Sequence, residues 1–223
     1  MEIVLVAGLW LDGSAWASVG AELERLGHRP IPVTLPVSAG TTLDDQVAAV
    51  LAAVDACTDK PWVVGHSAAS GLAWLAADAR PDRVAGVALV GGFPVGDGQP
   101  YAPAFPVVDG GMPFPGWEPF EGPDSVDLTA QARDGLAAAA IPVPEGVARA
   151  TVRLTDERRL DVPMVLVCPE YTPAQVKEWV ASGELPEVVA ARRVSYVDID
   201  SGHWPMMTRP VELARILADA VTA

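Results

Sequence analysis

The sequence predicts an α/β fold in which a parallel sheet of six strands carries helices on both faces. Six short runs of apolar, often β-branched residues are separated by stretches whose apolar residues recur at helical spacing. The first run, residues 3–6, is apolar at every position, as in a strand that is buried on both faces. Connections long enough to hold a helix favour right-handed crossovers, and therefore parallel strands.

The elements of the first half follow each other in a regular alternation. The first helix should end at Gly27, since glycine closes helices in the left-handed conformation. Thr42 and Asp45 have the spacing of a capping box at the start of the second helix. A third helix begins directly after Ser67. The six predicted strands are residues 3–6, 31–35, 62–65, 84–90, 162–168 and 194–199.

The alternation stops at Gly91. Residues 91–123 contain eight glycines and eight prolines, so no regular element of any length is expected there. Six of the 14 aromatic residues of the chain also fall in this segment, whereas disordered segments are poor in aromatics. A long loop of this kind inside a compact domain indicates a functional lid. We therefore expect one domain over residues 1–223, with a cap or lid inserted at residues 92–155.

The second half returns to strands and helices. Helices are predicted over residues 125–140, 147–154 and 173–181. Thr208 is the expected N-cap of the last helix, with Pro210 in its first turn.

Charge and composition exclude several classes of partner. The formal net charge of −14 repels nucleic acid and anionic membrane surfaces, so neither is an expected partner. No apolar run approaches the length of a membrane span, and the chain starts as a strand without a basic leader, so a cytoplasmic location is expected. Cys57 and Cys168 lie in apolar runs and are expected to be buried free thiols. Nothing in the sequence indicates an oligomeric state.

Ser67 lies at a sharp turn between a predicted strand and a predicted helix. Such a turn holds the serine hydroxyl at the carboxyl end of the sheet, beside the N-terminal dipole of the helix. Small residues are required two positions before and after the serine, because strand and helix backbones nearly touch; here they are Gly65 and Ala69. The turn has the form of a nucleophile elbow.

A serine nucleophile needs a base, and the chain has three histidines. His28 lies in a turn before the second strand, remote from the carboxyl edge of the sheet. His66 precedes Ser67 on the strand, so its side chain should point to the opposite face and not reach back. His203 follows the last strand, at the edge where open parallel sheets bind ligands, and is the predicted base.

Three carboxylates could orient that histidine. Glu170 is the first one after the fifth strand and gives the chain order nucleophile, acid, base, so we place it first. Asp97, after the fourth strand, comes second. Asp200 comes third, because a residue on the histidine's own loop seldom reaches its outer ring nitrogen. The oxyanion of an acyl-transfer reaction would be bound by the amides of Ala68 and Leu9.

These segments resemble the α/β-hydrolase superfamily, in particular the small group that contains methylesterases and hydroxynitrile lyases. The similar stretches are residues 4–10, 65–69, 165–170 and 200–205. The resemblance implies an α/β-hydrolase fold with strand order 2-1-3-4-5-6 and a cap that sets the substrate. The chain departs from the group's pattern at Ala7, where histidine is usual, and at Ala69, where glycine is usual. The acid of the group is more often Asp, and one alignment would place it at Tyr171.

The resulting hypothesis is a serine hydrolase that needs no cofactor or metal ion and cleaves a small to medium apolar ester or lactone. Trp204 occupies the position after the histidine where hydroxynitrile lyases carry lysine, which argues against cyanohydrin cleavage. Two alternatives stay open: a ligand-binding or regulatory protein with little turnover, and a tailoring lyase or cyclase. The residues expected to contact the small-molecule substrate are Trp10, Phe93, Phe105, Phe114, Trp117 and Trp204.

Overall fold

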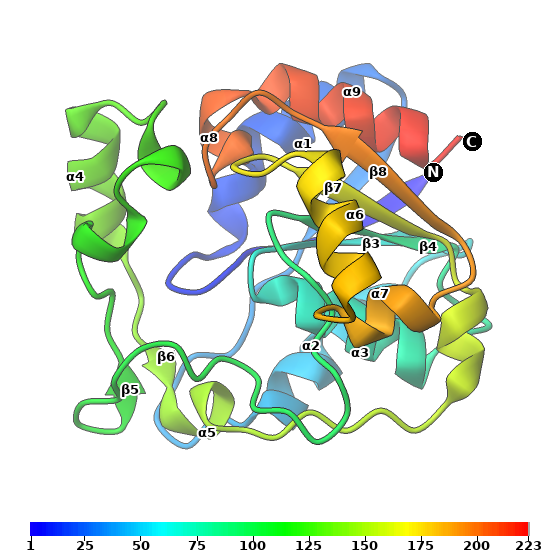
Figure 1. The fold of residues 1–223 in the computed structure, drawn as a ribbon, viewed down its shortest axis with the longest axis horizontal. Coiled ribbons are helices and arrows are strands. Elements are labelled where there is room, and N and C mark those ends of the chain that lie inside the picture. The colour runs from blue at the N-terminus through cyan, green and yellow to red at the C-terminus, as the bar shows by residue number, and fades with distance from the viewer. Residues whose placement is uncertain (223) are drawn as a thin grey trace.

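The computed structural model describes residues 1–222 and contains one six-stranded parallel sheet (Figure 1). Its strands are β1 (Glu2–Val6), β2 (Arg29–Pro32), β3 (Trp62–His66), β4 (Gly86–Val90), β7 (Met164–Cys168) and β8 (Val194–Asp198). They are ordered β2-β1-β3-β4-β7-β8, with every neighbouring pair parallel. This confirms the predicted fold and strand order.

The helices cover both faces of that sheet, and Figure 1 shows α1 and α9 on one side with α2, α3, α6 and α7 on the other. The α-helices are α1 (Ala17–Arg25), α2 (Leu43–Asp55), α3 (Ala69–Ala79), α4 (Ala130–Ala139), α5 (Glu145–Ala148), α6 (Pro173–Ser182), α7 (Pro186–Ala190), α8 (Pro205–Thr208) and α9 (Pro210–Ala220). The 3₁₀ helices within residues 1–222 are η1 (Gly13–Trp16), η2 (Glu118–Phe120), η3 (Pro123–Ser125) and η4 (Glu157–Asp161).

The alternation of side chains along the central strands divides the core into two layers. In β1, Val4 and Val6 belong to the layer that includes Leu72 of α3. Ile3 and Leu5 belong to the layer that includes Leu217 of α9. Both sets are fully buried, because successive residues of a strand point to opposite faces. Both faces of the sheet are thus covered, which leaves its carboxyl edge as the place where loops can form a site.

The segment 92–155 forms the left-hand and lower parts of the molecule in Figure 1 and includes α4, α5 and the two-stranded antiparallel sheet of β5 (Gly111–Met112) and β6 (Val143–Pro144). It is tied to the loop after β1 at two points. The Trp10 indole Nε1–H donates to the carbonyl oxygen of Met112, at 3.1 Å, and the Ile141 N–H donates to that of Trp10, at 3.0 Å.

Several predicted helix boundaries were wrong for local reasons. The helix predicted over 125–140 begins only at Ala130, because the Thr129 hydroxyl accepts from the N–H of Ala132 and caps it there. The helix predicted over 147–154 ends at Ala148. Beyond it the backbone bonds to residues 99–101 instead, with the Val152 N–H donating to the Gln99 carbonyl.

The expected cap of the last helix was also misplaced. Thr208 ends α8, and its hydroxyl lies 3.4 Å from the Trp204 carbonyl oxygen, so Arg209 is the residue that precedes α9. The second strand covers Arg29–Pro32 rather than 31–35. In contrast, the capping box of Thr42 and Asp45 is present as predicted.

Cys57 and Cys168 are buried free thiols, as predicted, and burial raises the pKa of Cys168 to about 12. Among residues 1–222, no helix is both long and apolar enough to cross a bilayer.

Candidate active site

Ser67 occupies the turn between β3 and α3 in a left-handed backbone conformation, with φ of 54°. Few non-glycine residues adopt this conformation, and it is a strain typical of functional sites. The Ser67 N–H donates to the Val90 carbonyl, at 2.8 Å, which holds the turn against β4. A Cβ added to Gly65 would lie 2.2 Å from the Ala69 carbonyl oxygen, so strand and helix approach closely enough to require the predicted glycine.

His203 and Glu170 meet at the carboxyl edge of the sheet. The His203 Nδ1 lies 2.8 Å from Glu170 Oε1, and both side chains are only 13% exposed. Since the carboxylate accepts, the imidazole carries its proton on Nδ1, which leaves the Nε2 lone pair free to take another proton. A Cβ on Gly91 would lie 3.3 Å from this Nδ1, so glycine there gives the pair room.

The other candidate carboxylates lie elsewhere. The Asp97 carboxylate accepts a hydrogen bond from the N–H of Leu154, which lies 2.8 Å away near the end of the segment 92–155. Asp200 has an exposed side chain, and its carbonyl oxygen accepts from Arg209. Tyr171 stacks on Phe93 instead of facing the histidine. Glu170, placed first from the sequence, is thus the carboxylate that contacts His203.

Sequence reasoning missed the contact that the His66 side chain makes. Its imidazole Nε2 lies 2.7 Å from the His203 carbonyl oxygen, and the two rings are 4.9 Å apart. The loop that carries His203 reaches this end of β3 and brings its carbonyl oxygen to the imidazole. Only the tertiary path of that loop reveals the contact. His28 lies outside the cavity that contains Ser67, as expected.

Leu9 and Ala68 are the two residues whose amides were predicted to bind an oxyanion. Both line the same cavity as Ser67, and neither backbone N–H donates a hydrogen bond within the described residues 1–222. Gly8 packs directly against the elbow, since a Cβ there would lie 3.0 Å from the Ser67 Cβ. A tetrahedral oxyanion needs donors of this kind, and the role of these two amides stays a prediction.

A cavity of about 270 Å³ contains Ser67 and His203. Its remaining walls are uncharged, and its volume is near the lower end of small-molecule sites. Three of the predicted substrate contacts line it: Trp10, Phe105 and Trp204. Sequence reasoning missed Tyr101 and Phe120, which also line it and belong to the aromatic-rich segment that was singled out.

The other three predicted contacts lie behind or beside this cavity. Phe114 and Trp117 pack on Phe120, with ring centroids 5.9 and 6.5 Å away, and so form a second layer of aromatic rings. Phe93 packs against Tyr171 and Trp179. For these three, ordinary packing accounts for the aromatic residue.

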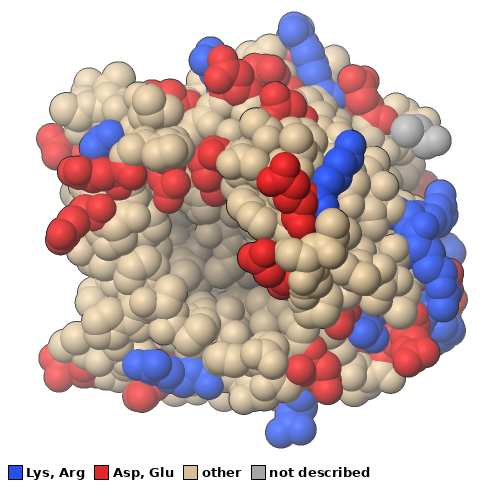
Figure 2. All heavy atoms as spheres, in the orientation of Figure 1, with Lys and Arg blue, Asp and Glu red and all other residues tan. Residues whose placement is uncertain are grey.

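Negative charge gathers around the mouth of the cleft. Figure 2 shows a hollow with mostly uncharged walls and with Asp and Glu side chains along its margin. Burial, together with the nearby Glu170 carboxylate, raises the pKa of Asp124. The Asp124 backbone carbonyl also accepts a 2.7 Å hydrogen bond from the His203 N–H, so the segment 92–155 directly contacts the histidine loop.

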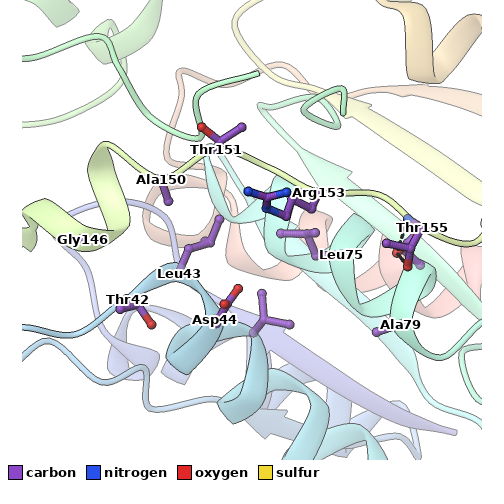
Figure 3. Close-up of a pocket in the computed structure, with 12 residues that line it drawn as sticks. Thr42, Leu43, Asp44, Leu75, Ala79, Gly146, Ala150, Thr151, Arg153 and Thr155 are labelled. Atoms are coloured by element: carbon purple, nitrogen blue, oxygen red, sulfur yellow. Dashed lines mark hydrogen bonds between the residues drawn. The ribbon is translucent and has the colours of Figure 1, made fainter. Parts of the chain in front are cut away.

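A separate cavity of about 440 Å³ lies between α2, α3 and the segment 146–155 (Figure 3). Asp44 and Arg153 line it together with aliphatic side chains such as Leu43 and Leu75. None of the predicted site residues is in it, and it holds no serine–histidine pair. Within residues 1–222, no cluster of His, Cys, Asp and Glu has the arrangement of a metal site.

Known proteins share this architecture. Residues 3–216 match the model of the alpha/beta hydrolase family. No curated protein sequence matches the chain. An extracellular α/β-hydrolase from a Paenibacillus species, described as a structural and functional homologue of tobacco salicylic acid binding protein 2, has a TM-score of 0.81 at 16% identity; the match covers 99% of this chain and 98% of that one.

Two further solved structures are similar over nearly their whole length. A pyrethroid hydrolase from Sphingobium faniae has a TM-score of 0.75 at 20% identity, covering 100% of this chain and 98% of that chain. A methylesterase from Arabidopsis has a TM-score of 0.72 at 15% identity, covering 100% and 99%. At these identities the likeness shows the fold, while the family match spans almost all of the chain. The chain therefore belongs to the α/β hydrolase family.

Proposed function

We propose that this protein is a serine hydrolase that cleaves a small to medium, apolar carboxylic ester or lactone through an acyl-enzyme. The observation that carries the proposal is the 2.8 Å bond between Glu170 and His203 at the cavity that also contains the strained Ser67. The names of similar proteins, a pyrethroid hydrolase and a methylesterase, support an ester substrate.

In this mechanism, Ser67 Oγ attacks the ester carbonyl while His203 Nε2 takes its proton. Glu170 holds the imidazole through Nδ1 and stabilises the imidazolium that forms. The amides of Leu9 and Ala68 bind the oxyanion of the tetrahedral intermediate. His203 then protonates the leaving alcohol, and water, activated by the same histidine, releases the acid and restores Ser67.

The walls of the cavity favour an uncharged substrate. Its lining contains no Asp, Glu, Lys or Arg, and most of the lining side chains are apolar or aromatic. The carboxylates at the mouth would repel an anionic ester and also the carboxylate product after cleavage. The volume of about 270 Å³ limits the group that enters beside Ser67 to a small one.

The decisive test replaces the nucleophile. Ser67→Ala should abolish hydrolysis of p-nitrophenyl acetate and labelling by a fluorophosphonate probe, while circular dichroism and the melting temperature stay close to wild type. Ser70→Ala is the matched control, since Ser70 lies one turn along on α3 with its hydroxyl directed at the Gly65 carbonyl. Full activity in Ser67→Ala would rule out the proposal.

One observation favours a binding protein as the second candidate. The Ser67 hydroxyl makes no hydrogen bond to the His203 ring in the described chain, although apo enzymes often close this contact only when substrate binds. A ligand-binding protein would retain a small aromatic ester unchanged and leave Ser67 unlabelled by the fluorophosphonate. Rapid labelling of wild type decides for the hydrolase.

A further inference from the structure

His66, the last residue of β3, lies between two loops of the site, and the mechanism above gives it no role. Its side chain is buried, with 1% exposure, and lines the cavity together with Ser67 and His203. A polar ring in such a place needs a physical explanation.

The hydrogen bond of His66 determines which of its nitrogens carries the proton. A carbonyl oxygen only accepts, so the Nε2 that lies 2.7 Å from the His203 oxygen must donate. Nδ1 is then the lone-pair nitrogen, and it is buried with no partner among the described residues. The Gly8 backbone closes this side, because a Cβ on Gly8 would lie 2.8 Å from Nδ1. Burial holds the pKa of His66 well below its usual range, so the ring is a neutral donor.

The main chain of His203 is held from two sides. Its N–H donates to the Asp124 carbonyl, at 2.7 Å, which belongs to the cap, and its carbonyl accepts from His66. The side chain is held separately by Glu170. Of these three contacts, only that of His66 comes from β3, the strand that ends in the Ser67 elbow. His66 is therefore the direct link between the strand of the nucleophile and the loop of the base, and it also packs on the loop that carries the Leu9 amide.

We infer that His66 is a positioning residue that sets the placement of the His203 imidazole, and of the oxyanion loop at Gly8, relative to Ser67. The inference rests on the proposed function, because it assigns a role within the same reaction. A histidine suits the role because it is long enough to cross the end of the strand and remains an uncharged donor when buried. An aliphatic side chain of similar size would fill the space but leave the His203 carbonyl unpaired.

The test compares two substitutions with opposite hydrogen-bonding ability. His66→Leu removes the donor, whereas His66→Gln retains an N–H at a similar reach. We expect kcat for p-nitrophenyl acetate, measured per Ser67 titrated with fluorophosphonate, to fall about 10- to 100-fold in His66→Leu, with KM changed less than about threefold. His66→Gln should recover kcat to within about fivefold of wild type. His28→Leu, at a half-buried histidine outside the cavity, should keep the wild-type rate.

A purely structural role gives a different result. It would lower the melting temperature or the yield of His66→Leu while leaving kcat per titrated Ser67 unchanged, and that outcome overturns the inference. Failure of the proposed function is recognised separately, because wild type itself would then neither turn over the ester nor label.

If wild type neither hydrolyses the ester nor labels, hydrogen exchange of the His203 amide, which donates to the Asp124 carbonyl, tests whether His66 positions the His203 loop. We expect this amide to exchange at least about tenfold faster in His66→Leu than in wild type and His66→Gln. Equal exchange in all three proteins would also overturn it.

Discussion

Replacing Glu170 by Gln removes one charge from the site and little else. Glu170 Oε1 lies 2.8 Å from His203 Nδ1, both side chains are mostly buried, and the amide oxygen of Gln can still accept this hydrogen bond. What disappears is the attraction between the carboxylate and the imidazolium that forms when Ser67 attacks. Two unit charges about 4 Å apart interact by about 4 kcal/mol at an effective dielectric constant near 20.

That interaction exists only after proton transfer, so its loss raises the barrier of the chemical step. At 1.36 kcal/mol for each factor of ten, kcat should fall by about 10³-fold, with KM little affected. A Gln amide turned the other way would force the wrong imidazole tautomer and cost up to about 10⁴-fold. The melting temperature should stay near that of wild type or rise slightly, because Glu170 Oε2 is already buried without a partner in the described structure.

The assay is steady-state hydrolysis of p-nitrophenyl acetate, with fluorophosphonate titration of Ser67 to count active sites. Glu178→Gln makes the same chemical change on the exposed surface of α6 and should leave kcat unaltered. A kcat for Glu170→Gln within about threefold of wild type would show that the observed bond does not stabilise the transition state.

Three further predictions concern the cavity and the buried titratable groups. Phe105→Ala should enlarge the cavity, and the assay is kcat/KM for a series of p-nitrophenyl esters. The ratio of kcat/KM for a longer acyl chain to that for acetate should rise by up to about fourfold for each methylene that the cavity accommodates. Phe93→Ala, outside the cavity, should leave this ratio unchanged. Asp124→Asn should raise the melting temperature at pH 7. Burial raises the pKa of this carboxyl in the folded state, so ionised Asp124 destabilises the protein once the pH rises above the ordinary Asp pKa. The increase in melting temperature should therefore vanish below about pH 4. An increase that persists at pH 3 would show that the buried charge is not its cause. Burial depresses the pKa of His66, so below about pH 6.5 this ring takes up a proton only when the protein unfolds. For each pH unit below that value, the unfolding free energy of wild type, measured by urea titration, should fall by about 1.4 kcal/mol more than that of His66→Gln. Equal slopes in the two proteins would contradict a neutral buried ring.

The sequence alone was sufficient to predict the fold and the order of the proposed nucleophile, acid and base along the chain. A continuous apolar run such as 62–65 is stable in water only when it is buried on both faces. A sharp turn between small residues, such as that of Ser67, has few possible backbone conformations. His203 and Glu170 were identified because parallel strands end at a common edge, so residues that follow them meet there. These are local or topological properties, and they survive without knowledge of side-chain packing.

Only the tertiary structure decided which of the nearby groups touch. The choice among Glu170, Asp97 and Asp200 depends on where three separate loops run, which no pattern in the chain encodes. The same holds for the cap: six aromatic residues between 93 and 120 look alike in the sequence, yet Phe105 and Phe120 line the cavity whereas Phe93 packs elsewhere. The contact of His66 was missed because strand alternation describes the direction of its side chain but not the position of the His203 loop. Long-range contacts of this kind depend on the packing of the whole molecule. The chemical groups of the site could therefore be predicted from the sequence, whereas the contacts between them required the tertiary structure.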